Sequence, residues 1–256
     1  MMGTSHAASG AAAWIALTAT TLPALGAHEL APAAVLLGAP IAAGAALLPD
    51  ADHHSATIAH SVPIAGRLAA GVVGAVSGGH RKGMHSLLAV LGVIVGMRFL
   101  GEVVWHPDGS VEPYHLGVAI AVAACTAFAL KVLRIARRWP LAWAGGAALG
   151  AAAGFLAPAQ TSWLPWCVGV GYLAHLAGDL LTTGGIPLLW PIRVRAPRWA
   201  RRTPLLRRVW LRGGGIAVPI LGDTGSWREQ ALFAALSCYA LWGVAAEAAA
   251  VLAGGM

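Results

Sequence analysis

The sequence predicts an all-α, polytopic membrane helical bundle, with about seven transmembrane helices and one short interfacial helix. Of its 256 residues, 58% are hydrophobic and only 11% are charged, whereas soluble domains carry about 25% charged residues. A chain so poor in charge cannot cover a globular surface with polar side chains, so lipid is its natural solvent. We expect residues 1–256 to form a single integral membrane domain.

Seven apolar stretches are candidate spans, because about 17 to 25 apolar residues cross the hydrocarbon core as a helix. The stretch at residues 64–76 is too short to cross and contains Arg67, so we interpret it as an interfacial or re-entrant helix. No Lys or Arg precedes the first stretch, as a signal peptide would require, so we expect it to stay as a span. The seven stretches are residues 10–25, 30–48, 87–105, 116–133, 141–157, 163–181 and 231–252.

The distribution of positive charge orients this predicted bundle. If the N-terminus is cytoplasmic, the loops expected outside contain no Lys or Arg, and they are residues 26–29, 106–115 and 158–162. The positive-inside rule therefore predicts a multi-pass protein of a bacterial-type inner membrane with a cytoplasmic N-terminus. The same orientation brings several motifs far apart in the sequence to one membrane face.

A basic segment, residues 192–229, separates the motif-bearing residues 1–191 from the last predicted transmembrane helix at residues 230–253. Nine of the seventeen Lys and Arg residues lie between Thr183 and Gln230. The run from Arg193 to Arg212 is interpreted as an amphipathic segment that contacts anionic phospholipids of the inner leaflet, or equally as a solvated basic loop. We expect membrane lipids as partners and no nucleic acid, although the net charge is +7.

The first motif follows the second predicted span and places two carboxylates beside two imidazoles. Asp50, Asp52, His53 and His54 lie within five residues. Oxygen and nitrogen donors of this kind bind zinc, manganese or iron. The alternative is a solvated loop cap that marks the exit from the membrane.

The second motif precedes the third predicted span and contains His80, Arg81 and His85. His85 can project from the start of the helix while His80 comes from the preceding loop. The planar guanidinium of Arg81 suits a phosphate or a carboxylate, although Arg81 and Lys82 also fit ordinary anchoring at the inner face.

The third motif lies inside a predicted span, where ionisable groups indicate function by default. His175 and Asp179 are four residues apart and share one helix face. Asp179 can bind metal, or hold His175 by a hydrogen bond, or do both. His6 lies at the start of the first span at a matching depth, where a capping role is an equal alternative.

Other polar residues are interpreted as structural. Glu229 starts the last helix and has a smaller chance of entering the site. Arg98 and Glu102 are interpreted as a mutually neutralising pair, which in a transporter would instead line a polar path. The three cysteines lie in separate apolar runs and predict no disulfide framework, and His28, His106 and His115 are placed at the external face.

The order of these motifs resembles the YdjM-like family of inner-membrane proteins, which is regarded as a family of metal-dependent hydrolases. The resemblance covers residues 6–191, and Met84 replaces the Thr usual before the second His of the second motif. It implies a distant similarity to zinc-dependent phospholipase C and the P1-type nucleases, and so phosphoester hydrolysis. The matching positions are His6, Asp50, Asp52, His53, His80, Arg81, His85, Ser86, His175, Asp179, Thr182, Gly185 and Pro187 to Pro191.

The leading hypothesis is a hydrolase that uses zinc, or else manganese, to lower the pKa of a bound water toward about 7. Arg81 would stabilise the anion, and His80 would act as general acid or base. The alternatives are an ion or proton transporter and a scaffold that binds a cytoplasmic partner. The predicted metal ligands are His6, Asp50, Asp52, His53, His85, His175 and Asp179.

Overall fold

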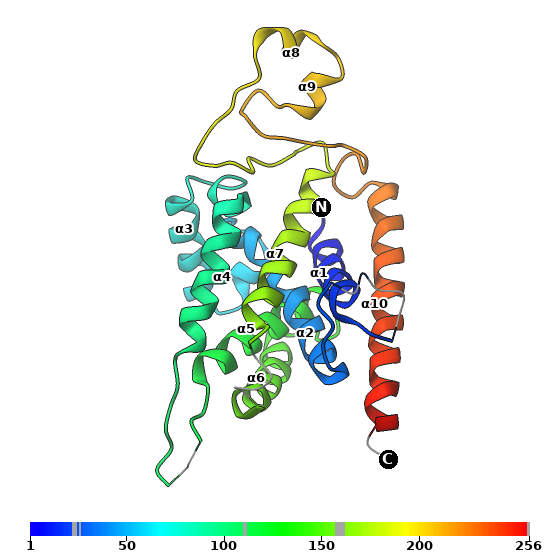
Figure 1. Ribbon diagram of the computed structural model, residues 1–256. Helices are drawn as coiled ribbons and strands as arrows, with labels where there is room; N and C mark the ends of the chain where they lie inside the picture. Colours follow the sequence, from blue (N-terminus) through cyan, green and yellow to red (C-terminus); the bar gives the residue numbers. More distant parts are fainter. Residues whose placement is uncertain (22–24, 26, 110–111, 157–161, 255–256) are drawn as a thin grey trace.

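The computed structural model describes residues 1–21, 25, 27–109, 112–156 and 162–254, and within them the chain is helical (Figure 1). The predicted all-α class is confirmed, and only isolated β-bridges join extended segments of these residues. Seven long helices match the seven predicted stretches. They are α1 (Gly3–Thr18), α2 (Pro32–Ala45), α4 (Leu87–Gly101), α5 (Leu116–Val132), α6 (Trp139–Leu156), α7 (Leu164–Leu180) and α10 (Trp227–Gly254).

Short helices connect the long ones on the side of the predicted motifs. A 3-10 turn, η1 (Leu48–Asp52), continues α2, and η2 (Thr57–His60) leads to α3 (Ala65–Val76). A further turn, η3 (Gly83–His85), precedes α4. Helix α3 confirms the helix predicted at residues 64–76, and its exposed apolar side chains include Leu68 and Val72. Its position at a membrane interface stays a prediction.

Two helical segments of the described chain have the length and apolar composition to cross a membrane. They are Pro32–Asp52, which combines α2 with η1, and Trp227–Gly254, which is α10. Other helices are apolar but shorter, including Leu87–Gly101 and Leu116–Val132. The seven helices are therefore observed, whereas seven crossings stay a prediction.

The predicted boundaries are wrong at four helix ends, and one of them is the end of α1, which lies at Thr18 rather than at residue 25. Helix α1 begins at Gly3, seven residues before the apolar stretch, because Ala7 and Ala8 continue the helix toward the N-terminus. Helix α4 ends at Gly101, and Trp105 pairs instead with Tyr114 in an antiparallel bridge. Helix α10 begins at Trp227, inside the predicted basic segment. Residues 22–24 and 26 of the first predicted span, and residue 157 of the fifth, lie outside the described residues.

Helix α2 lies at the centre of the bundle because small residues let its neighbours approach closely. A Cβ on Gly10 of α1 would lie 2.4 Å from the carbonyl oxygen of Ala42, and one on Gly171 of α7 would lie 2.2 Å from the same oxygen. A Cβ on Gly44 would lie 1.8 Å from the carbonyl oxygen of Cys125 in α5. This packing fixes α2 against three helices, and so fixes the turn that carries Asp50.

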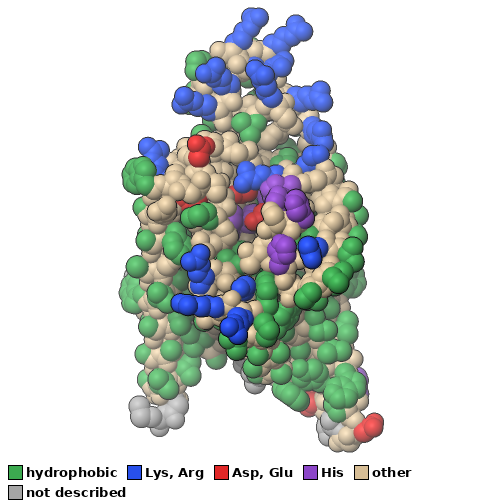
Figure 2. Space-filling model, turned by 180° about the vertical axis from the view of Figure 1, so that it is seen from behind, with side chains coloured by type: hydrophobic (Ala, Val, Ile, Leu, Met, Phe, Trp, Pro, Cys, Tyr) green, Lys and Arg blue, Asp and Glu red, His purple; other side chains and the backbone are tan. Residues whose placement is uncertain are grey.

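The basic segment after α7 projects beyond the helix bundle (Figure 1). Its two short helices, α8 (Arg198–Arg202) and α9 (Leu206–Val209), are separated by Thr203, Pro204 and Leu205. Proline and glycine interrupt helices, so the expected amphipathic segment is not one continuous helix. Figure 2 shows Lys and Arg side chains spread over this projecting part.

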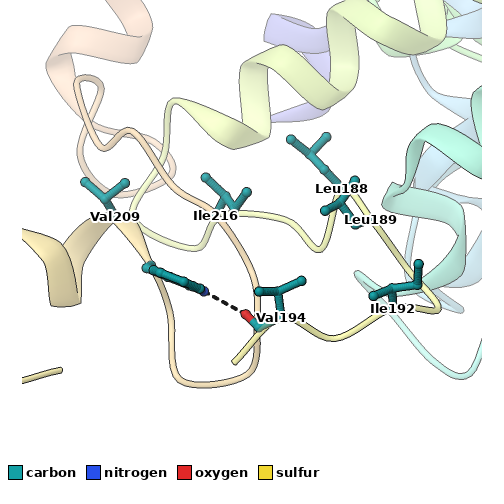
Figure 3. Close-up of a pocket in the computed structure, with 8 residues that line it drawn as sticks. Leu188, Leu189, Ile192, Val194, Val209 and Ile216 are labelled. Atoms are coloured by element: carbon teal, nitrogen blue, oxygen red, sulfur yellow. Dashed lines mark hydrogen bonds between the residues drawn. The ribbon is translucent and has the colours of Figure 1, made fainter. Parts of the chain in front are cut away.

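An apolar cavity of about 290 Å³ lies between residues 188–194 and residues 209–216. Figure 3 shows Leu188, Leu189 and Ile192 on one side of it, with Val209 and Ile216 on the other. The indole nitrogen of Trp210 donates a hydrogen bond to the carbonyl oxygen of Val194 across the segment. The projecting part therefore has a small apolar centre of its own.

Candidate metal centre

Histidine and aspartate side chains from four elements meet at one end of the bundle. Helix α1 contributes His6, and the turn η3 before α4 contributes His85. The turn η1 contributes Asp50 and Asp52, and the last turns of α7 contribute His175 and Asp179. Histidine side chains gather with neighbouring acidic and basic ones below the projecting basic segment (Figure 2). The convergence predicted from membrane depth is therefore present in the fold.

Two imidazole nitrogens of this cluster face each other, and a carboxylate oxygen from each of two aspartates lies near both of them. Nε2 of His85 lies 3.3 Å from Nε2 of His175. Oδ1 of Asp50 lies 3.7 and 3.9 Å from these two nitrogens, and Oδ2 of Asp179 lies 3.6 and 3.7 Å from them. Zinc–ligand bonds of about 2.0–2.1 Å in a tetrahedron place neighbouring ligand atoms about 3.3 Å apart. The separation of the two nitrogens equals this value, and the separations from the carboxylate oxygens to the nitrogens exceed it by 0.3–0.6 Å. Donor atoms of Asp50, His85 and His175 all lie within 4.8 Å of one another, as a group that could hold a metal ion.

The orientation of His175 leaves the correct nitrogen available for a metal. Its Nδ1 lies 2.7 Å from the carbonyl oxygen of Ala46. A carbonyl oxygen only accepts, so Nδ1 carries the proton and donates it. Nε2 then keeps its lone pair toward Asp50, His85 and Asp179. Metal-binding histidines characteristically donate their other ring N–H in this way.

His6 joins a second group of donors on the far side of Asp179. Its ring stacks on His175 with centroids 3.6 Å apart, and its Nε2 lies 3.4 Å from Oδ1 of Asp179. Potential donor atoms of His6, His175 and Asp179 all lie within 4.8 Å of one another. Asp179 thus faces both groups, and its Oδ1 also contacts the amino group of Met1.

Asp52 lies beside the four-donor group rather than in it. Its Oδ1 is 2.9 Å from Nδ1 of His80, and its Oδ2 is 3.7 Å from Nδ1 of His85. The carboxylate is buried, whereas the His80 side chain is 39% exposed. Asp52 therefore orients the imidazole of His80 and lies near that of His85 without a hydrogen bond to it.

His53 is also outside both donor groups. Its Nδ1 lies 2.7 Å from the hydroxyl of Ser55, and its ring meets the ring of His80 edge-on at 4.4 Å. His54 stacks on His53 and is exposed. The residues of the first motif therefore have different positions in the fold. Asp50 faces the donor atoms of His85 and His175, whereas His53 and His54 lie at the edge of the cluster.

Arg81 reaches the cluster from a loop with an unusual backbone. Its φ of 54° lies in the left-handed region, which a non-glycine residue occupies at a cost. Its Nη2 lies 3.3 Å from Oδ2 of Asp179. A Cβ on Gly184 would lie 2.1 Å from Nη1 of Arg81, so the glycine makes room for the guanidinium. The half-buried cation therefore lies at the mouth of the donor group.

The donor set fits a divalent metal on chemical grounds. His6, His85, His175 and Asp179 are almost completely buried, and buried charges are normally paired or coordinate metals. Within the described part of the chain, Nδ1 of His6 and Nδ1 of His85 are buried without a hydrogen-bond partner. Nitrogen and carboxylate oxygen donors of this mixture suit zinc or manganese.

Two supporting residues were underestimated or missed at the level of sequence. The hydroxyl of Tyr172 donates to the carbonyl oxygen of Met84 at 2.6 Å, which fixes the turn that carries His85. Glu229 is fully buried and accepts hydrogen bonds from the backbone N–H groups of Met2 and Gly225 at 2.6 and 2.8 Å. Tyr172 lies three residues before His175 on the same helix face, a spacing that could have identified it.

At the opposite end of the bundle, the expected Arg98–Glu102 ion pair is not formed. Both side chains are exposed and line a groove of about 660 Å³ together with His115. Nε2 of His115 is buried without a hydrogen-bond partner among the described residues. Residues of an apolar helix that share a face therefore do not necessarily pair. The three cysteines are free, as expected.

The helical fold and the buried His/Asp centre define a class of membrane-associated helical proteins with a potential metal site. Comparison with known proteins agrees with this class, because the sequence profile described as YdjM inner membrane protein matches residues 1–250. The chain therefore belongs to the YdjM inner membrane protein family. The family resemblance inferred from the motif order is confirmed, and it supports an inner membrane location.

Two curated relatives share a short segment with this chain. The inner membrane protein YdjM of Escherichia coli (strain K12) is 49% identical over 37 residues. That of Shigella flexneri has the same identity over the same length. The matched segment covers 14% of this chain and 16% of each relative. No solved structure matches.

Proposed function

We propose that this chain is a membrane-embedded, metal-dependent hydrolase that cleaves a phosphate ester of a lipid or lipid-linked molecule at the cytoplasmic face. The observation that carries the proposal is the convergence of donor atoms from Asp50, His85, His175 and Asp179 at separations of 3.3–3.9 Å. Structural ion pairs alone do not require two buried imidazole nitrogens to face each other.

Zinc is the metal that the donor set favours, with manganese as the alternative. These four residues would hold it, with His6 next to them across Asp179. Bound there, the ion would act as a Lewis acid and activate a water molecule near neutral pH. The burial of the histidines limits the water around the reacting groups and so strengthens electrostatic interactions.

Arg81 would bind the phosphate and stabilise charge in the transition state. Its guanidinium lies at the mouth of the donor group and is 31% exposed, so a ligand can reach it. An arginine can present two parallel N–H donors to phosphate oxygens. Its position 3.3 Å from Asp179 keeps the cation next to the reacting centre.

His80 would transfer a proton at the rim of the site. Its Nδ1 lies 2.9 Å from Oδ1 of Asp52, which fixes the ring orientation and favours a proton on that nitrogen. The opposite nitrogen, Nε2, is then available to accept or return a proton. The partial exposure of His80 permits exchange of that proton with solvent.

The proposal includes seven crossings with a cytoplasmic N-terminus. It is supported by seven helices at the predicted stretches and by the absence of Lys and Arg from the loops predicted outside. Two segments already have the length and composition of a span. In this orientation the cluster and the basic segment lie on the cytoplasmic side.

The decisive experiment measures metal content and turnover on the same sample. The protein would be purified in detergent without chelators and analysed by metal mass spectrometry. Phosphate release from phosphatidic acid vesicles would be followed before and after chelation, with zinc or manganese added back. We expect stoichiometric metal and turnover that chelation removes and metal restores. Protein that neither holds nor takes up metal would overturn the proposal in favour of a transporter or scaffold.

A further inference from the structure

Helix α3 turns its small residues toward the protein and its large apolar residues away from it. A Cβ on Gly66 would lie 2.5 Å from the carbonyl oxygen of Ala59, and one on Gly74 would lie 2.9 Å from that of Asp52 in η1. Ala70, between the two glycines, is buried. The face of α3 that packs against the protein therefore consists of Gly66, Ala70 and Gly74.

The opposite face of α3 carries large apolar side chains. Leu68, Val72 and Val76 each follow a residue of the packed face by two positions, which places them about 200° around the helix axis from it. With Ile64, just before the helix, they form a row that we term the α3 stripe, and its side chains are 64–79% exposed. A helix at a surface in contact with water normally turns its apolar face toward the core. The α3 stripe therefore indicates contact with an apolar environment outside the protein.

Helix α4 continues this apolar surface. Its exposed side chains include Leu88, Leu91 and Phe99, which are 53–73% exposed and share one side of the helix. Figure 1 shows α3 and α4 at the same edge of the bundle. The loop of residues 77–86 therefore lies between two helices with exposed apolar side chains.

The charges beside this apolar surface are all positive. Residues 53–101 contain no Asp or Glu, and the formally charged residues among them are Arg67, Arg81, Lys82 and Arg98. Two copies of the chain meeting through the α3 stripe would bring like charges together, which is unfavourable. Anionic lipid head groups would instead neutralise these charges. The surface therefore matches a bilayer leaflet better than a second copy.

The loop between α3 and α4 carries polar groups that reach the candidate metal centre. His80 is 39% exposed, and its Nδ1 lies 2.9 Å from Oδ1 of Asp52. Arg81 is 31% exposed, and its Nη2 lies 3.3 Å from Oδ2 of Asp179. Exposed histidine and basic side chains lie close to hydrophobic ones at one side of the molecule in Figure 2. Both side chains therefore contact the cluster and remain open to a ligand from outside.

We propose that the α3 stripe lies among the acyl chains of the inner leaflet and so holds His80, Arg81 and Lys82 at the depth of the lipid phosphates. Amphipathic helices at an interface bury their apolar face at the boundary between head groups and acyl chains. The inference rests on the proposed function and narrows its substrate to a phospholipid that stays in the bilayer. The phosphate of such a lipid approaches Arg81 sideways, between α3 and α4.

The test measures the depth of three labels in nanodiscs of phosphatidylethanolamine and phosphatidylglycerol. A bimane fluorophore is attached to the new cysteine of Val72→Cys, Lys82→Cys or Thr203→Cys, each combined with Cys238→Ser because Cys238 is exposed. Thr203 is the control, since it is exposed in the projecting basic segment. If Val72→Cys does not fold, Leu68→Cys replaces it on the same stripe. Three quenchers are compared: a nitroxide on the acyl chain, a nitroxide on the head group, and iodide in the water.

We expect the acyl-chain nitroxide to remove most of the fluorescence at position 72 and the head-group nitroxide to remove most of it at position 82. Iodide should act mainly at position 203. Quenching of position 72 by iodide would overturn the proposal, and so would protection of that position from all three quenchers, which a second protein chain would cause. Quenching of position 82 by iodide alone would also overturn it, because the loop would then lie outside the head groups.

The fluorescence measurement needs neither metal nor turnover. Its result is therefore independent of the experiment that tests the hydrolase. Protein that holds no metal but shows the expected depths would reject the hydrolase and leave α3 as a helix that contacts lipid. Protein with metal-dependent turnover but an iodide-accessible position 72 would keep the hydrolase and reject the sideways approach.

Discussion

The two ends of the bundle use the same kinds of residue with different results. At the end that carries the candidate metal centre, Asp179 has Arg81, His85 and His175 within 3.7 Å. At the other end, Arg98 and Glu102 lie on one face of α4 and its terminus yet form no ion pair, and both are exposed.

The difference shows that convergence of several elements, rather than spacing within one helix, makes a buried polar site. The centre draws donors from α1, η1, the loop before α4 and α7, each fixed by packing against α2 or α7. Among the described residues, the lining of the groove at the far end includes one cation, one carboxylate and one imidazole, from Arg98, Glu102 and His115. Metal binding should therefore depend on the first end alone.

The largest effect is expected from removing a ligand at the centre. His175→Ala should weaken metal binding by more than 100-fold, because loss of groups that merely orient ligands already costs about 10–100-fold. The metal content of the purified protein is measured by mass spectrometry. His115→Ala, a matched change at the far end, should leave the metal content unchanged. An equal loss of bound metal in His175→Ala and His115→Ala would show that metal binding does not depend on the first end in particular.

Arg81 should separate turnover from metal binding. Arg81→Ala is expected to lower the rate of phosphate release by about 10²–10³, the cost of losing one transition-state donor. The metal should remain, because the guanidinium competes with it for Oδ2 of Asp179. Arg98→Ala should preserve both quantities. Metal loss in Arg81→Ala would instead assign the arginine a structural role.

Asp52 should show an intermediate effect, because it orients His80 and stands 3.7 Å from Nδ1 of His85. Asp52→Asn is expected to weaken metal affinity by about 10–100-fold, as measured by competition with a chelator of known affinity. Asp223→Asn is the matched control, since the carboxylate of Asp223 accepts a hydrogen bond from the exposed hydroxyl of Thr183, away from the donor group. An unchanged affinity in Asp52→Asn would remove Asp52 from the support of the site.

The smallest effect concerns the two buried glutamates of α10. Both Glu229 oxygens accept backbone N–H bonds, so Glu229→Gln turns an NH₂ group toward a donor. We expect a loss of about 1–3 kcal/mol in unfolding free energy. In Glu247 only Oε1 has a partner among the described residues, so Glu247→Gln should be nearly neutral. Thermal unfolding in detergent compares the melting temperatures of Glu229→Gln and Glu247→Gln. Equal melting temperatures would contradict the different roles assigned to the two glutamates.

The sequence predicted the helices well because long apolar runs are a strong local pattern. It missed the start of α1 at Gly3, where small residues continue the helix without an apolar run. It also predicted an ion pair for Arg98 and Glu102 from spacing alone, and such spacing permits a contact without requiring it.

The residues of the site were identifiable from sequence, but their arrangement was not. His53 and Asp50 lie in one motif, yet only Asp50 faces the centre, because the direction of each side chain depends on the turn of η1. The backbone carbonyl of Ala46 orients His175, and this contact could not be predicted from the sequence because it does not depend on the side chain of residue 46. Long-range packing decides such contacts.

The most direct test of the central claim is X-ray absorption spectroscopy at the zinc edge of stoichiometrically loaded protein. The arrangement of Asp50, His85, His175 and Asp179 predicts nitrogen and oxygen ligands at about 2.0–2.1 Å, with imidazole scattering that weakens in His175→Ala. Sulfur ligands at about 2.3 Å, or a spectrum unchanged by His175→Ala, would contradict a metal centre built from these four residues.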